Sequence, residues 1–155
     1  MEIEYLTELI NHSYINFSGQ TVKNKPLPIE EIKTLEKQFN NVAIFPKALK
    51  ELLFLAGGYC DGLDYGLCET QQELQNIVKE VLEDSNLKIE RPFYVIDIYN
   101  GGDQFFFVYL DEGNNPKVYE AISEYQQLRI KQIGNSLSEF IAHLIALKKE
   151  ERERR

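Results

Sequence analysis

The chain has 155 residues, of which 43% are hydrophobic and 27% are charged, a balance typical of a soluble globular protein and too apolar for a disordered one. This length fits one domain, and we expect residues 1–155 to form it, with a core at about 27–147 and a charged tail at 148–155. The net charge of −8 is unfavourable for general binding of nucleic acid, where affinity comes from neutralising phosphates, and it suits a basic partner.

The first part of the chain carries one weak helical pattern and one polar stretch. Ile3, Leu6 and Ile10 recur at helical spacing and predict a short helix over residues 2–12. Residues 16–28 are polar and contain glycine and proline, which predicts a loop.

Three stronger helices follow, each with a start signal. Pro28 precedes the first, at residues 29–39, and Pro46 opens the second, whose buried face lies between Leu49 and Ala56. A capping box at Thr70 starts the third, which ends near residue 85. We expect Gly57-Gly58 to end the second of these helices with a left-handed residue.

The pattern then changes to β-branched and aromatic residues. Four strands are expected, at residues 93–99, 104–110, 117–122 and 127–133. The glycines in Asn100-Gly101-Gly102-Asp103 tolerate positive φ, which predicts a hairpin turn between the first two strands. Both faces of the first strand are apolar, so we expect it to be central in the sheet and covered on both sides.

A second capping box at Ser136 opens the last helix, which is apolar to Leu147 and should fray over the charged residues 148–155. The order of elements predicts an α+β fold, with an antiparallel β-meander sheet packed by N-terminal and C-terminal helices on one of its faces.

The cysteines and the hydropathy of the chain indicate the cellular compartment in which the protein is expected. Cys60 and Cys68 do not match a disulfide scaffold or the spacing of a zinc pair, so we expect ordinary thiols of a reducing compartment. No stretch approaches the roughly 20 apolar residues of a membrane helix. The start of the chain lacks a basic region followed by an apolar run, so we expect no signal peptide and a cytoplasmic protein that does not bind a membrane.

The sequence contains no recognisable catalytic motif, and we expect no metal site, no cofactor and no enzymatic activity. Seven carboxylates lie in or near the predicted sheet: Asp61, Asp64, Asp97, Asp103, Asp111, Glu112 and Glu120. Two of them could act as a general acid and base, as in a hydrolase, if they converged in a pocket and one had a raised pKa. Scattered, solvated carboxylates are the interpretation that we favour.

The acidic residues are concentrated in the middle of the chain. Residues 57–124 contain fourteen acids and only four bases, together with six tyrosines, and a seventh tyrosine follows at Tyr125. Tyrosines beside carboxylates suit a surface that grips a partner rich in arginine and lysine. About half of these aromatic residues should instead fill the packed face of the sheet.

Three segments resemble the SUKH superfamily, which includes the Smi/Knr-type yeast cell-wall regulators and many bacterial immunity proteins. They are Ile29 to Gly58 with its Ile44-Phe45-Pro46-Lys47 and Gly57-Gly58, then Gly101-Gly102-Asp103 with the strand Phe105 to Leu110, and Ser136 to Leu147. The chain departs from the usual family pattern at Phe45, at Ala48 and Leu49, at Ala56, and in having no tryptophan.

The resemblance implies a non-enzymatic immunity protein, which would bind and neutralise the toxic domain of a cognate polymorphic or contact-dependent toxin, such as a nuclease. The acidic face would then occupy a basic active site as a nucleic-acid mimic. The residues predicted to bind the partner are Tyr59, Asp61, Asp64, Tyr65, Tyr99 and Asp103. A regulatory protein-binding scaffold of the Smi/Knr type stays open as an alternative, and the protein is expected to be a monomer or a homodimer.

Overall fold

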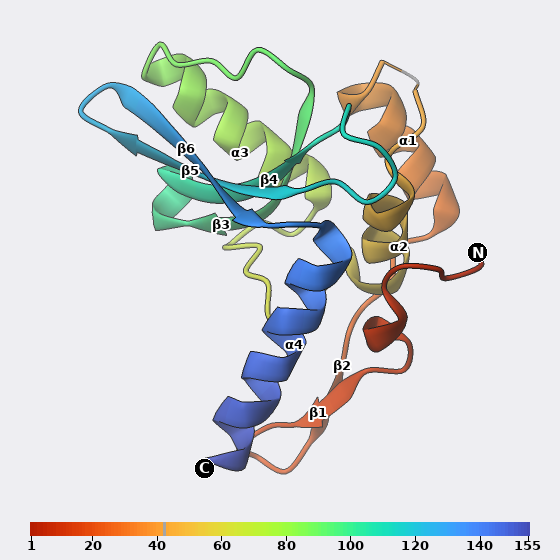
Figure 1. Ribbon diagram of the computed structural model, residues 1–155. Coiled ribbons are helices and arrows are strands. Elements are labelled where there is room, and N and C mark those ends of the chain that lie inside the picture. The colour runs from red at the N-terminus through yellow and green to blue at the C-terminus, as the bar shows by residue number, and fades with distance from the viewer. Residues whose placement is uncertain (42) are drawn as a thin grey trace.

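A four-stranded antiparallel sheet lies at the centre of the protein, whose computed structural model describes residues 1–41 and 43–155 (Figure 1). The strands are β3 (Phe93–Tyr99), β4 (Gln104–Tyr109), β5 (Val118–Glu124) and β6 (Gln127–Gly134), each beside the next in chain order. The predicted meander is thereby confirmed. The turn between β3 and β4 has positive φ at Asn100, Gly101 and Gly102, a conformation that glycine adopts without steric cost.

Helices cover both faces of this sheet, so the expectation of a single covered face is wrong. They are α1 (Ile29–Phe39), α2 (Lys47–Ala56) and α4 (Leu137–Glu153) on one face, and α3 (Gln71–Asp84) on the other. Along β4, Phe105 and Phe107 pack with α3, whereas Phe106 and Val108 pack with the other helices. Strands that are apolar on both faces require a covering layer on each side, and the result is an α+β fold.

Strand β3 is covered on both faces, as predicted, but it is an edge strand and not a central one. Gln75 of α3 accepts from the Val95 N–H and donates to the Val95 carbonyl, both at 2.8 Å. The Ile98 N–H donates to the Asp64 carbonyl at 2.9 Å. These contacts satisfy backbone groups on the outer edge in place of a neighbouring strand.

The predicted helix over residues 2–12 is wrong, because its amides bond to a side chain instead. The segment contains only the 3₁₀ turn η1 (Thr7–Leu9). Oε1 of Glu51, on α2, accepts from three consecutive amides. They belong to Glu4, Tyr5 and Leu6, at 3.1, 2.8 and 3.0 Å. This long-range contact overrides a weak local helical preference.

The predicted loop over residues 16–28 contains a short strand. β2 (Thr21–Lys23) pairs with β1 (Ser13–Ile15) in an antiparallel hairpin. Oδ1 of Asn16 closes the turn by accepting from the N–H groups of Ser18 and Gln20. Three-residue strands are too short to show a clear alternation in sequence. Figure 1 shows this hairpin beside the C-terminal end of α4.

Gly57 ends α2 in a right-handed conformation, with φ of −69°, so the predicted left-handed residue is wrong. Glycine is needed here for space, because a Cβ atom would lie 2.6 Å from Cγ of Leu27 and 2.6 Å from the carbonyl oxygen of Leu53. We expect Gly57→Ala to lower the free energy of unfolding by about 1–3 kcal/mol, the usual result of overpacking. Urea denaturation measures this, and a loss below about 0.5 kcal/mol would show that the neighbours move aside.

Candidate functional site

The loop after α2 is fixed to the segment that follows the N-terminal hairpin. The Lys25 N–H donates to the Tyr59 carbonyl at 2.9 Å, and the Gly58 N–H donates to the Lys25 carbonyl at 2.8 Å. The Asp61 N–H donates to Oδ1 of Asn24 at 2.7 Å. These bonds hold Tyr59 and Asp61 against the hairpin, although the two residues are distant from the hairpin in sequence.

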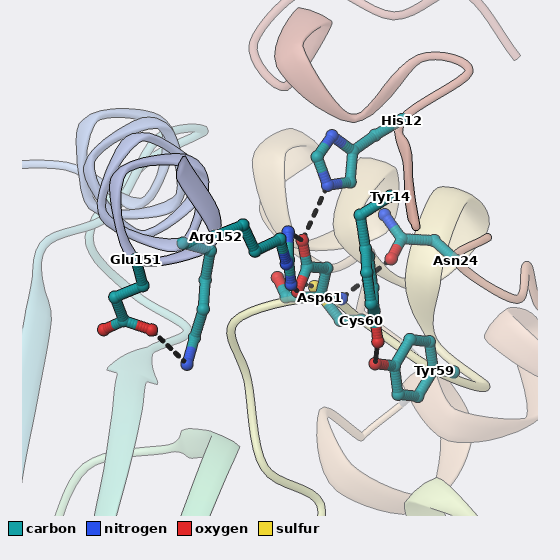
Figure 2. A network of polar contacts seen from close by, with 9 residues as sticks. His12, Tyr14, Asn24, Tyr59, Cys60, Asp61, Glu151 and Arg152 are labelled. Atoms are coloured by element: carbon teal, nitrogen blue, oxygen red, sulfur yellow. Dashed lines mark hydrogen bonds and ion pairs between the residues drawn. The ribbon is translucent and has the colours of Figure 1, made fainter. Parts of the chain in front are cut away.

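Asp61 joins three distant segments of the chain, as Figure 2 shows. Its side chain is only 3% exposed. Arg152 of α4 makes a two-pronged ion pair with it, from Nη1 to Oδ2 at 2.8 Å and from Nη2 to Oδ1 at 2.5 Å. Nε2 of His12, just before β1, lies 2.7 Å from Oδ2. We call Asp61, Arg152 and His12 the Asp61 clasp.

The charge of Asp61 is matched inside the protein. Burial alone would raise the pKa of Asp61, but the hydrogen bonds from Arg152 and His12 outweigh burial and hold the pKa below its ordinary value of 3.8. The same ion pair raises the pKa of Arg152. Asp61 is therefore a carboxylate at neutral pH that adds little to the negative field outside the protein.

Aromatic contacts extend the clasp to the end of α4. The Arg152 guanidinium lies 3.6 Å from the centre of the Tyr14 ring, and the Arg155 guanidinium lies 3.9 Å from that of Phe17. The hydroxyl groups of Tyr14 and Tyr59 are 2.7 Å apart. Burial, with the Tyr14 contact, raises the pKa of Tyr59. Because α4 continues to Glu153 and is anchored there, the predicted fraying of the charged tail is wrong.

Two pockets that share Asp64 and Tyr99 lie beside the clasp. The first has a volume of about 360 Å³ and a polar lining that includes Tyr14, Tyr59 and cations at the C-terminal end of the chain. The second has a volume of about 350 Å³ and a more apolar lining. We call the two together the groove. Among the residues that line the groove are Tyr14, Tyr59, Asp64, Leu67, Ile77 and Tyr99.

Asp97 of β3 lies beneath the groove and is 0% exposed. Its Oδ1 accepts from the N–H groups of Asp64 at 2.8 Å and Ile98 at 2.9 Å. Its Oδ2 accepts from the Tyr99 hydroxyl at 2.9 Å. Burial raises the pKa of Asp97 to about 7, although these three hydrogen bonds favour the carboxylate. Asp97 thus supports both residues that the two pockets share.

The structure brings together four of the six residues predicted to bind a partner. Tyr59, Asp61, Asp64 and Tyr99 all line the first pocket. Tyr65 is half-buried, and its hydroxyl donates to the Ala56 carbonyl at 3.0 Å. Asp103 is exposed in the turn between β3 and β4, outside the lining of either pocket. That these six residues contact a partner stays a prediction.

Sequence reasoning missed Tyr14, Arg152 and the supporting role of Asp97. Tyr14 and Arg152 had no local signal, since the Arg152–Asp61 contact spans 91 residues of sequence. Asp97 did carry a signal, because it is the one acid within the apolar run of β3. A charged residue in such a run is expected to have buried hydrogen-bond donors.

The hydrolase alternative requires two accessible acids, one of them with a raised pKa. Asp97 has the raised pKa, but it is fully buried and both of its oxygens accept from protein groups. It lines neither pocket of the groove. The geometry therefore favours a supporting carboxylate over a general acid that reaches a substrate.

Two further findings concern only residues 1–41 and 43–155. None of their helices is long and apolar enough to cross a membrane. No three of their His, Cys, Asp or Glu side chains are grouped so that they could hold a metal ion.

The chain matches a protein-family model. The model of the SMI1/KNR4 family (SUKH-1) matches residues 26–143. This range includes α1, α2, the turn between β3 and β4, and the start of α4, where the resemblance was noted. No curated protein and no solved structure matches. Because the family model covers well over half of the chain, the protein belongs to the SMI1/KNR4 family (SUKH-1).

Proposed function

We propose that the protein is a non-enzymatic immunity protein, which binds and neutralises the toxic domain of a cognate polymorphic or contact-dependent toxin. Its membership of the SUKH family supports this proposal, since proteins of this family are in general non-catalytic and immunity is consistent with membership. The proposed place of action is the cytoplasm, where such a domain would act on its own producer.

The observation that carries the proposal is an open groove with large apolar side chains exposed around it. Leu67 lines the second pocket and is 101% exposed. Phe17, beneath the guanidinium of the pocket-lining Arg155, is 83% exposed. Tyr59 and Tyr99 line the first pocket. Exposed apolar residues gathered around a groove, with tyrosines inside it, are typical of a protein-binding surface.

The proposed partner is basic. The chain carries a net charge of −8, and Asp64 and Asp103 are exposed on the groove and on the adjacent turn. A nuclease active site, which binds phosphate with cations, would offer the complementary charge. Attraction of this kind acts mainly on the rate of association.

Co-expression with the C-terminal domain encoded by the adjacent upstream reading frame tests the proposal. We expect the two proteins to purify together and the chain to restore growth of cells that express the domain. If the domain is toxic and the chain neither binds it nor restores growth, the immunity proposal is wrong. An upstream gene unrelated to toxins would favour the regulatory scaffold of the Smi/Knr type.

Neutralising Asp64 in the groove and Asp103 on the adjacent turn should weaken this complex. We expect Asp64→Asn with Asp103→Asn to lower affinity about fivefold at low salt and to flatten its salt dependence, because two exposed charges contribute modestly. Calorimetric titration at several salt concentrations measures both effects. The matched control is Glu30→Gln with Glu31→Gln on α1, which removes the same charge from an exposed site outside the groove. Equal effects of the two double variants would contradict a role for the groove.

A further inference from the structure

The hydrogen bond between Tyr99 and Asp97 fixes the direction of one proton in the groove. The Tyr99 hydroxyl donates to Oδ2 of Asp97 at 2.9 Å. While Asp97 is ionised it has no proton to give, so the Tyr99 oxygen can only present its lone pairs to the groove. The neighbouring Asp64 carboxylate, which lines both pockets, is also an acceptor.

We propose that Asp97 determines the specificity of the groove, because it makes Tyr99 and Asp64 a pair of acceptors for a cationic side chain, a lysine or arginine, of the partner. This inference rests on the proposed function and adds the chemical class that the groove selects. Asp97 acts here as a positioning residue, since it is fully buried and acts through Tyr99 and the Asp64 backbone.

Protonation of Asp97 would reverse this arrangement. A proton on Oδ2 turns the carboxyl into the donor, the Tyr99 oxygen becomes its acceptor, and the Tyr99 proton turns toward the groove. One proton is taken up from solvent and no covalent bond other than that O–H bond is formed. Tyr99 then presents a donor where the cation needs an acceptor, so binding should weaken.

Burial is the main reason that Asp97 takes up a proton near neutral pH, and titratable groups from several elements surround it. From the loop after α2 they are Cys60, Asp64 and Tyr65, and from β3 itself Tyr99. On β4 the directly paired residue, Phe106, carries no charge. The cations that line the first pocket are Lys148 and Arg152 of α4 and Arg155, which follows the helix. Lys148 and Arg152 are paired with Glu151 and Asp61, and burial raises the pKa of Asp97 to about 7.

Asp97→Asn provides a direct test, because asparagine reproduces the protonated state. Its Oδ1 can accept from the Asp64 and Ile98 amides, and its Nδ2 can only donate to Tyr99. For the co-purified toxin domain we expect the variant at about pH 8 to bind about tenfold more weakly than wild type, with an affinity that no longer changes down to about pH 6. Wild type should lose affinity over the same range. Glu30→Gln, an exposed control on α1 outside the groove, should keep the wild-type pH profile.

Tyr99→Phe distinguishes this role from a loss of folding. If Asp97 acts through the Tyr99 hydroxyl, Tyr99→Phe and the double variant with Asp97→Asn should bind equally, at both pH values. An affinity of Asp97→Asn that equals wild type at about pH 8, or that still changes with pH as wild type does, would overturn the proposal.

A second arm needs no partner and separates failure of this inference from failure of the proposed function. In the free protein, N-acetylarginine amide serves as the cation, and the Asp64 and Ile98 amide signals report its binding by NMR. We expect these signals to titrate together near neutral pH and the probe to bind more tightly above that midpoint. Absence of toxin binding with this behaviour intact would overturn only the proposed function. Flat amide signals, or probe binding that ignores pH, would overturn the role of Asp97.

Discussion

Replacing Arg152 with alanine should lower the free energy of unfolding by about 3–5 kcal/mol, the range found when one partner of a buried ion pair is removed. The Asp61 side chain is 3% exposed and that of Arg152 is 17% exposed, so the remaining carboxylate would be buried without its main partner. The lost stacking of the guanidinium on Tyr14 adds to this effect.

Urea denaturation near neutral pH measures the change, with Arg154→Ala as the control. The side chain of Arg154 is 78% exposed and pairs with Glu150 at 3.9 Å, so its removal should change stability by at most about 0.5 kcal/mol. If the two variants differed by less than about 1 kcal/mol, the Asp61 clasp would not hold the end of α4 in solution.

The pH dependence of wild type gives an independent check on the clasp. The pKa of Asp61 is held below 3.8, so the folded state binds this proton more weakly than the unfolded state. The clasp therefore contributes fully at neutral pH, and its contribution falls as the pH drops through the folded pKa of Asp61. In Arg152→Ala, the free energy of unfolding should therefore fall less than in wild type as the pH drops through this range.

The regular elements were predictable because their signals are local. The helical stripe after Pro28, the capping boxes at Thr70 and Ser136, and the alternating strands each lie within a few turns of chain. The errors occur where a distant group decides the structure. Glu51 bonds the amides of residues 4–6 and prevents a helix there. Gln75 bonds β3 and lets a strand covered on both faces lie at the edge.

The same distinction explains how much of the site was predictable. Composition indicated the acidic and tyrosine-rich middle of the chain, and Tyr59, Asp64 and Tyr99 do line one groove. Composition alone does not distinguish a carboxylate that faces solvent from one that forms an ion pair inside the protein. Asp61 is such a matched charge, because its partner Arg152 lies on the last turns of α4.

Asp97→Asn should make the fold more stable near pH 8, although it is expected to weaken binding. The pKa of Asp97 is about 7 in the folded protein and 3.8 ordinarily, so the folded state binds this proton more tightly. Between these values wild type loses stability as the pH rises, by up to roughly 4 kcal/mol, since each pKa unit corresponds to about 1.4 kcal/mol. The asparagine variant has no such proton to lose.

Denaturation of both proteins across about pH 4 to 8 tests this. We expect near-equal stability at the acid end, where Asp97 is protonated, and a growing advantage of Asp97→Asn toward the alkaline end. A constant difference between the two proteins would mean that Asp97 titrates below this range. Near pH 8 the ionised Asp97 is expected to make the fold less stable than asparagine would at the same position. Such a residue needs a role outside folding, since stability and function are often opposed at binding sites. The hydrogen bond to Tyr99 supplies that reason, because it fixes an acceptor in the groove that asparagine would convert into a donor.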